Sequence, residues 1–305
     1  MTVNTARQHI MDKKSNKIIP QKAELAQIKN FVFDLDGTLL TSEHQVSPKT
    51  VDMITKLQQK NKKIIFCSGR PWYFIKKYYF QLKPDFPIIS CNGSLIYDYK
   101  NNSVVFSKSF APSQVEKIFQ ILVKYKVIFL IYTTTNMLAF SEKNKNCLWF
   151  SYLRKQNENF SEIEKLPLTF YEYQDLEQTE INNLEIVKFL LIKRDSDPEL
   201  FQLAISELEK IANIYLVQSQ SAVIDIMISG SNKGEGLKFF EKNYNVDLEK
   251  TLAFGDAKND LSMFAVAKFS VAMGQSHSEV QEKATFVTKS NDQDGIADFF
   301  EKYYE

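Results

Sequence analysis

Short apolar runs alternate with helix-spaced apolar positions in the chain that follows residue 29. A continuous apolar run bounded by turn residues is typical of a buried strand, whereas apolar positions three or four residues apart are typical of a helix. The pattern predicts strands at 30–34, 63–67 and 87–91 and helices near 48–60 and 71–80. This alternation favours parallel strands joined by right-handed crossovers.

The alternation of predicted strands and helices ends after Gly93. Two stretches, 94–99 and 103–110, flank the polar tripeptide 100–102 and together predict a hairpin. The segment that follows predicts helices from Pro112 and over 198–211, with strands at 127–132, 187–192, 214–218 and 222–228. We therefore expect an α+β sheet with helices on one face.

The parallel pattern resumes near Ser229, so the first unit is predicted to be discontinuous in sequence. The chain has 305 residues, more than the roughly 100 to 200 of a usual single domain, which favours two domains. Residues 1–29 carry six basic and two acidic residues. Because these charges are scattered and aromatic residues are absent, we interpret this extension as a solvated tail or short helix and assign it no role.

Composition and charge argue against several classes of binding partner. The 38 basic and 37 acidic residues leave a net charge of +1, which predicts neither a nucleic acid nor a membrane surface as a partner. No stretch approaches the roughly 18 apolar residues of a membrane span, and the start lacks a signal-peptide apolar region. Cys67, Cys91 and Cys147 lack metal-ligand spacing, so we expect reduced thiols and a cytoplasmic protein.

Asp34 and Asp36 leave the apolar run Phe31–Phe33 together, just before Gly37. Ionised carboxylates beside apolar residues need a cation or backbone amides, and hard oxygen ligands suit Mg²⁺. Asp34 is then a candidate nucleophile, and Asp36 a candidate general acid and base. The alternative is a strand-end turn that uses Asp-Gly only for its backbone geometry.

Three further segments place polar residues where strands end or helices begin. Ser68-Gly69-Arg70 follows one apolar run, and Asp256 and Asp260 follow another, as a site at the carboxyl edge of a parallel sheet requires. Lys233 adds a cation at a predicted helix start. Singly these could be a turn, a helix cap and a solvated surface lysine. Together they supply a nucleophile, an acid, metal ligands, a hydroxyl group and a cation.

These segments resemble the four motifs of the haloacid dehalogenase superfamily of phosphohydrolases, in the family's order: DLDGT at 34–38, Ser68, Lys233 and GDAKND at 255–260. The sequences SCNGS at 90–94 and NKG at 232–234 also resemble the Cof-type branch, which carries a large cap. The resemblance implies a Rossmann-like, doubly wound parallel α/β core at 30–93 and 229–305, with an inserted α+β cap at 94–228.

By this resemblance, Asp34 attacks phosphorus to form an aspartyl phosphate, while Asp36 protonates the leaving oxygen and then activates water. A Mg²⁺ ion would be held by the Asp34 carboxylate, the Asp36 backbone carbonyl and the Asp256 carboxylate. The other implied site residues are the phosphate-binding or orienting Gly37, Ser68, Lys233 and Asn259, the supporting Asp260, and the candidate substrate contacts Asn92 and Arg70.

The expected function is Mg²⁺-dependent hydrolysis of a small phosphate monoester. Sugar phosphates are the leading substrate class, and flavin and pyridoxal phosphates are further candidates. A phosphotransferase or phosphomutase on the same scaffold, or a metabolite-binding regulator without turnover, remains an alternative. We interpret the aromatic residues Tyr132, Trp149, Phe150 and Tyr152 as cap core or helix surface, and His9, His44 and His277 form no triad or metal spacing.

Overall fold

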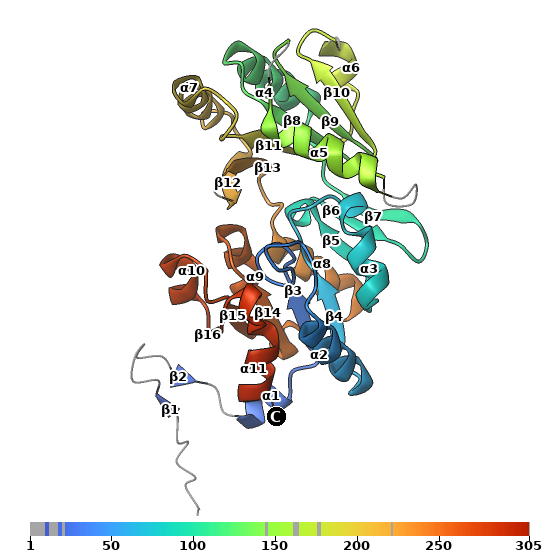
Figure 1. Cartoon of the computed structure of the whole chain (residues 1–305), viewed down its shortest axis with the longest axis vertical. Coiled ribbons are helices and arrows are strands. Elements are labelled where there is room, and N and C mark those ends of the chain that lie inside the picture. Colours follow the sequence, from blue (N-terminus) through green and yellow to red (C-terminus); the bar gives the residue numbers. More distant parts are fainter. Residues whose placement is uncertain are drawn as a thin grey trace, which may run out of the picture.

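The computed structural model describes residues 10–11, 18–19, 22–143, 146–160, 165–175, 178–220 and 222–304. Figure 1 shows two bodies stacked along the long axis of the molecule. The lower body contains a five-stranded sheet built from both ends of the chain, and the upper body contains a six-stranded sheet built from the middle.

The five-stranded sheet is parallel throughout, in the order β16-β15-β14-β3-β4. Its strands are β3 (Asn30–Phe33), β4 (Lys63–Phe66), β14 (Thr251–Gly255), β15 (Phe269–Ala272) and β16 (Phe286–Val287). Phe31 is paired with both Ile64 and Leu252, so segments distant in sequence lie side by side at its centre. The predicted parallel core is confirmed.

Alternate residues of β3 face opposite helical layers. Phe31 and Phe33 pack in one buried cluster with Ile54 of α2 and Phe300 of α11, while Val32 packs in another with residues of α8 and α9. These helices are α2 (Pro48–Gln59), α8 (Lys233–Tyr244), α9 (Leu261–Phe264) and α11 (Gly295–Tyr303). Burial on both faces is the reason that β3 is apolar from Phe31 to Phe33.

The strand predicted at 87–91 is shorter and pairs differently from the expectation. β5 (Ile88–Ser90) forms an antiparallel sheet with the hairpin β6 (Leu95–Asp98) and β7 (Ser103–Ser107), and only a Cys67–Ile89 bridge joins it in parallel to the end of β4. The hairpin is confirmed. Its Ile96 shares a buried cluster with Val32, so the hairpin packs against the lower body.

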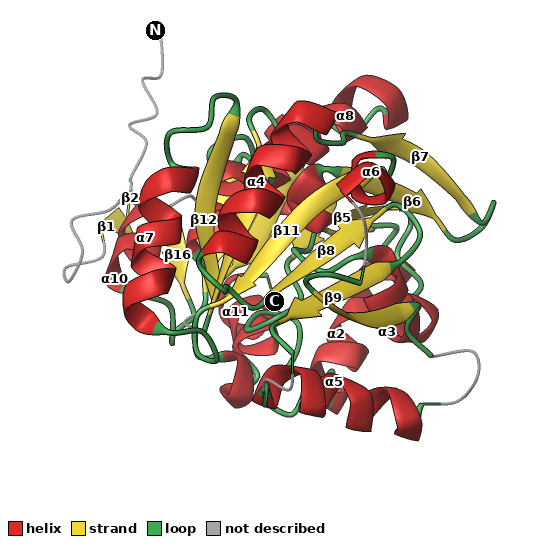
Figure 2. Cartoon of the chain, turned by 90° about the horizontal axis from the view of Figure 1, so that it is seen from above, coloured by secondary structure: helices red, strands yellow, loops and turns green. Residues whose placement is uncertain are grey.

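The six-stranded sheet has the order β10-β9-β8-β11-β13-β12. Its strands are β8 (Phe129–Thr133), β9 (Met137–Ser141), β10 (Leu168–Glu172), β11 (Ile186–Ile192), β12 (Ile214–Gln220) and β13 (Val223–Ile228). Figure 2 shows α4 (Pro112–Lys124), α6 (Gln178–Asn182) and α7 (Pro198–Leu208) over its outer face.

The expectation of helices on one face only was wrong. Phe150 and Leu153 of α5 (Leu148–Asn159) pack with Leu130 and Leu190 on the face opposite to α4 and α7. This second layer exists because β8 and β11 are buried on both faces. In Figure 1, α5 lies on the side of the sheet that is turned toward the lower body.

The remaining elements are short. They are β1 (Ile10–Met11), β2 (Ile18–Ile19), α1 (Lys22–Ala26), α3 (Lys76–Leu82), α10 (Ser278–Lys283) and 3-10 turns at Trp72–Phe74, Cys91–Gly93, Leu248–Lys250, Lys258–Asp260 and Asn291–Gln293. The helix predicted near 71–80 is thus a 3-10 turn followed by α3. Most of the predicted extension at 1–29 lies outside the described residues. In the described part of the chain, no helix is long and apolar enough to span a membrane.

Candidate active site

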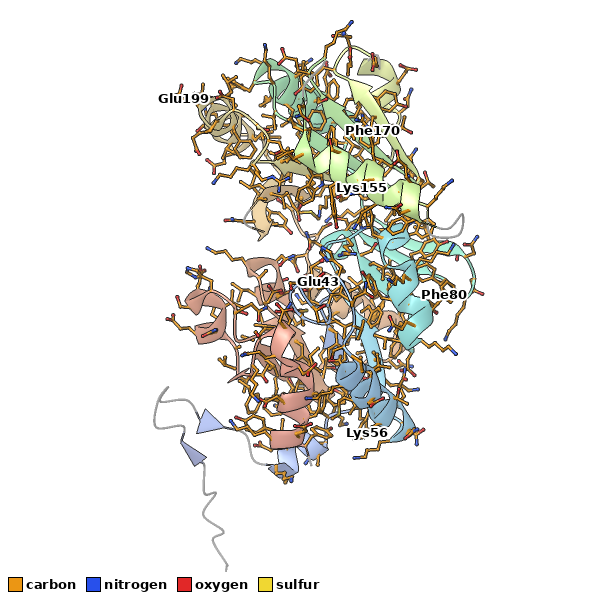
Figure 3. The ribbon with its side chains drawn as sticks, in the orientation of Figure 1. Glu43, Lys56, Phe80, Lys155, Phe170 and Glu199 are labelled. Atoms are coloured by element: carbon orange, nitrogen blue, oxygen red, sulfur yellow. The ribbon has the colours of Figure 1, made fainter. Side chains whose placement is uncertain are left out.

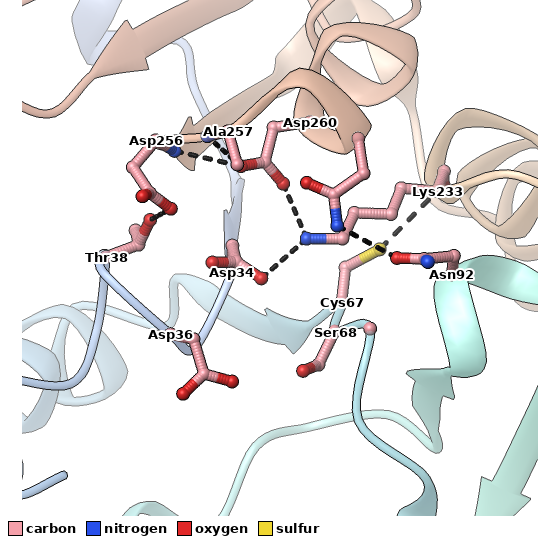
Figure 4. A network of polar contacts seen from close by, with 12 residues as sticks. Asp34, Asp36, Thr38, Cys67, Ser68, Asn92, Lys233, Asp256, Ala257 and Asp260 are labelled. Carbon is pink, nitrogen blue, oxygen red and sulfur yellow. Dashed lines mark hydrogen bonds and ion pairs between the residues drawn. The ribbon is translucent and has the colours of Figure 1, made fainter. Parts of the chain in front are cut away.

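The predicted site residues meet at the carboxyl edge of the five-stranded sheet. Asp34 follows β3, Ser68 follows the end of β4, and Asp256 follows β14. Because these strands are parallel, their carboxyl ends open on the same edge. Lys233 reaches the same place as the first residue of α8, whose Asn232 side chain caps the helix by accepting a hydrogen bond from the Glu235 amide. Figure 4 shows this convergence.

Lys233 joins two carboxylates in the interior. Its Nζ lies 2.5 Å from Asp34 Oδ1 and 2.5 Å from Asp260 Oδ1, and its side chain is completely buried. Burial acts to lower the pKa of Lys233, but the charges of Asp260 and Asp34 outweigh it and hold that pKa above its ordinary value. The lysine is therefore a fixed positive charge beside the candidate nucleophile.

Asp260 also holds the loop that carries Asp256. Its Oδ2 accepts hydrogen bonds from the backbone amides of Asp256 and Ala257, at 2.8 and 2.9 Å. Both oxygens of Asp260 are thus engaged, one with the loop and one with Lys233 (Figure 4). This geometry suits the supporting role predicted for Asp260.

Asp34 and Asp256 are crowded acids. Burial and the charge of Asp260 raise the pKa of Asp34 to about 7, although the charge of Lys233 acts to lower it. Burial and the charges of Asp34 and Asp260 raise the pKa of Asp256 to about 9. Carboxylate oxygens of the three acids lie within 4.8 Å of one another. Such a cluster of hard oxygen donors fits a divalent cation.

Gly37 leaves room for the Asp256 carboxylate. Thr38 Oγ1 donates to Asp256 Oδ1 at 3.2 Å, whereas a Cβ atom on Gly37 would lie only 2.4 Å from Asp256 Oδ2. Gly37 also has φ +75°, a backbone conformation that favours glycine. Gly37 thus lies against the acidic cluster. Its phosphate-binding role, which the motif implies, stays a prediction.

Asp36 is held by a cation. Nε of Arg70 donates to Asp36 Oδ2 at 2.7 Å, and a terminal nitrogen donates to Oδ1 at 2.6 Å. Burial acts to raise the pKa of Asp36, but the charge and hydrogen bonds of Arg70 hold it below its ordinary value. The Arg70 backbone amide also donates to Ser68 Oγ at 3.1 Å. In the view of Figure 4, Asp36 and Ser68 lie on the side of Asp34 away from Asp260.

The two predicted asparagines form a bridge toward the six-stranded sheet. Asn259 Nδ2 donates to Asn92 Oδ1 at 3.0 Å, and Asn92 Nδ2 donates to Asp225 Oδ2 of β13 at 2.9 Å. Asn92 has φ +53° and is almost completely buried. Its neighbours are therefore side chains from both bodies of the molecule.

A cavity of about 920 Å³ opens from this edge toward the six-stranded sheet. Figure 3 shows Glu43, one of its lining residues, at the level where the two bodies meet. Besides the acids, it is lined by Arg70, by Lys188 and Leu190 of β11, and by the aromatic residues Tyr73, Phe74, Tyr78, Tyr132, Trp149, Tyr152 and Phe160. Its size suits a small-molecule ligand.

Sequence reasoning missed several of these lining residues. Trp149 and Tyr152 lie on the surface of α5, in agreement with the interpretation as helix surface, but that surface lines the cavity. Tyr132 also lines the cavity, whereas Phe150 belongs to the buried core. His44 belongs to none of the recognised motifs, yet its Nδ1 lies 3.7 Å from Asp36 Oδ1. A usable signal existed for Lys188, because a lysine inside an otherwise apolar strand is unusual.

Named phosphatases are among the proteins that this chain resembles. A Bacillus subtilis 5-amino-6-(5-phospho-D-ribitylamino)uracil phosphatase is 29% identical over 90% of this chain and 98% of its own length. The pyridoxal phosphate phosphatase YbhA of Escherichia coli is 27% identical over 87% of this chain and 95% of its own.

Solved structures show the same fold. A haloacid dehalogenase-like hydrolase from Bacteroides thetaiotaomicron superposes with a TM-score of 0.73 at 25% identity, covering 90% of this chain and 99% of that one. Residues 31–300 match the family described as haloacid dehalogenase-like hydrolase. The chain therefore belongs to the haloacid dehalogenase-like hydrolase family and is a hydrolase.

Proposed function

We propose that this phosphatase of the haloacid dehalogenase family hydrolyses a small phosphate monoester in the cytoplasm, with Mg²⁺ as its cofactor. The observation that carries the proposal is the buried constellation in which Lys233 contacts Asp34 and Asp260 while Asp256 lies within the same acidic cluster. The buried, unpaired state of Cys67, Cys91 and Cys147 supports a reducing compartment.

In the proposed first step, a carboxylate oxygen of Asp34 forms a bond to phosphorus while the bond from phosphorus to the leaving oxygen breaks. Asp36 gives its proton to that oxygen. In the second step, Asp36 takes a proton from water as the water oxygen attacks phosphorus, which frees Asp34 and releases inorganic phosphate. Asp36 must separate from Arg70 to act as an acid, since that arginine binds both of its oxygens in this structure.

The other residues provide positioning and charge. Ser68 and the Lys233 ammonium would bind phosphoryl oxygens, where the positive charge offsets the charge that develops in transfer. A Mg²⁺ ion held by Asp34, the Asp36 carbonyl and Asp256 would supply further charge compensation. Asp260 would keep Lys233 and the Asp256 loop in place, a role supported by its contacts with both.

Sugar phosphates are the leading substrate class, with flavin and pyridoxal phosphates also within the size of the 920 Å³ cavity. We propose that residues 94–228 form the cap that closes this cavity, over a core at 30–93 and 229–305. Closure would exclude water while Asp34 is attacked. The domain division is supported by the separate buried clusters of the two large sheets, whereas the hairpin of β6 and β7, at the start of the proposed cap, packs against the core.

The test is release of inorganic phosphate from a panel of sugar, nucleotide and cofactor phosphates, with and without Mg²⁺. Asp34→Asn is the control without a nucleophile, and Asp52→Asn, an exposed acid on α2, is the matched neutral change. Metal-dependent release that Asp34→Asn loses would support the proposal. Transfer of phosphate to a second hydroxyl would favour a phosphotransferase, and tight binding without turnover would favour a regulator.

A further inference from the structure

Lys188 is a charged residue in a strand that is buried along its whole length. Phe189 and Leu191 of β11 belong to the cluster beneath the outer helices, whereas Leu190 and Lys188 line the cavity on the opposite face. A register shift between Ile186 and Lys188 interrupts the pairing of β11 with β8. Such irregularities re-aim side chains next to functional sites.

The charge of Lys188 is balanced inside the protein. Its Nζ lies 2.9 Å from Asp225 Oδ2 on the neighbouring strand β13, and their side chains are 3% and 0% exposed. The ammonium also lies 5.1 Å from the ring centre of Tyr132. A buried ion pair gains little stability over apolar residues of similar volume, so sheet packing alone does not account for this pair.

Both members of the pair also contact the other body. Lys188 Nζ donates to the backbone carbonyl of Gly69 at 2.9 Å, and Asp225 Oδ2 accepts from Asn92 Nδ2 at 2.9 Å. Gly69 lies between Ser68 and Arg70 in the loop that follows β4. A second contact holds the backbone of this loop, because the backbone amide of Asn92 donates a hydrogen bond to the Ser68 carbonyl. One ion pair of the six-stranded sheet thus contacts the Ser68–Arg70 segment directly through Lys188, and indirectly through the contact of Asp225 with Asn92.

We infer that Lys188 and Asp225 are positioning residues for phosphoryl transfer: they hold the two bodies together and fix the Ser68–Arg70 loop in its working position. The inference rests on the proposed function of that loop. Substrate would enter the cavity when these contacts are open, and their closure would then fix the backbone between Ser68 and Arg70. Neither residue touches the reacting atoms, so their effect is on the organised state of the loop.

The experiment compares the wild type with Lys188→Met and with the double variant Lys188→Met/Asp225→Asn. The double variant guards against misfolding, because it leaves no unpaired buried charge. Lys193→Met, an exposed lysine just after β11, is the matched control. Steady-state kinetics use p-nitrophenyl phosphate and the best panel substrate, thermal unfolding checks the fold, and hydrogen–deuterium exchange without substrate follows residues 68–70 and 91–92.

We expect kcat to fall by about 10- to 100-fold on both substrates, because a small misplacement of a binding loop affects every ester it holds. KM should change little, and exchange at 68–70 and 91–92 should become faster. A folded double variant with wild-type kcat and wild-type exchange would overturn the inference. So would a change confined to KM of the panel substrate, which would make Lys188 a leaving-group contact.

The exchange measurement separates the two hypotheses. If the wild type releases no phosphate, the proposed function fails, while exchange at the loop still decides whether Lys188 and Asp225 hold it. Faster exchange would then support the structural half of the inference, and unchanged exchange would reject it.

Discussion

Arg70 binds both carboxylate oxygens of Asp36, the residue proposed as the acid and base. The pair lies at the cavity, and each side chain is about one-fifth exposed, at 19% and 23%. The contact keeps Asp36 ionised in the free enzyme, because the pKa of Asp36 is below its ordinary value despite burial. If Asp36 acts as the acid, Arg70 must release it when substrate enters.

Arg70→Met should shift the alkaline limb of kcat/KM to higher pH. Without the cation, burial remains and the pKa of Asp36 rises, so the protonated acid persists to higher pH, by about one unit or more. The measurement is a pH profile with p-nitrophenyl phosphate. Lys77→Met, which removes another cation at the cavity, should leave the limb in place; an unmoved limb in Arg70→Met would exclude this role.

Lys233→Met should strongly destabilise the fold as well as end turnover. The change leaves Asp34 and Asp260 buried without their shared cation, a defect that costs about 3–5 kcal/mol of unfolding free energy. Urea denaturation measures the loss. Lys233→Met/Asp260→Asn should recover part of that stability but no activity, and equal stability of the two variants would contradict the electrostatic explanation.

Gly37→Ala should raise the Mg²⁺ concentration needed for half-maximal activity by about 10- to 100-fold, as for residues that orient a ligand. The new Cβ would meet Asp256 Oδ2 at 2.4 Å. Gly230→Ala is the matched control, since Gly230 has nearly the same φ, +76°, but its Cβ would meet only Lys108 Nζ, at 3.0 Å. An equal rise in the required Mg²⁺ concentration for both variants would show that the effect of Gly37→Ala comes from backbone strain and not from the contact with Asp256.

Trp149→Ala should raise KM for the best panel substrate by about tenfold while leaving p-nitrophenyl phosphate unaffected. Trp149 lines the cavity from α5, with the Arg194 guanidinium 5.9 Å from the ring centre. Its loss removes contact with the leaving group but not with the phosphate. Trp149→Phe should retain most of the affinity, and a fall in kcat on both substrates would point instead to a disturbed closure.

The core could be predicted from sequence because its signals are local. Phe31 to Phe33 form an uninterrupted apolar run that ends in two acids, and parallel pairing then places Asp256 beside Asp34. By contrast, α5 has only Phe150 and Leu153 buried, which gives too weak a helical pattern to detect. The strands β9 and β10 were missed as well.

The contacts between the two bodies could not be predicted in the same way. Gly69 and Lys188 are 119 residues apart, and Asn92 and Asp225 are 133 apart. No periodicity encodes such pairs, because they depend on how the two sheets face each other. The sequence marks Asp225 and Lys188 only as charges within apolar strands, without indicating their partners.

The pairing of β3 with β14 has a consequence for biosynthesis. Asn30 and Thr251 are neighbours in the sheet although 221 residues separate them in the chain. At a translation rate of about 5–20 residues per second, β3 leaves the ribosome on the order of ten to forty seconds before its central partner. For most of that interval the nascent chain contains Asp34 without Lys233, and for all of it without Asp256. Neither the sheet nor the charge balance around Asp34 is therefore complete until the last fifth of the protein is made.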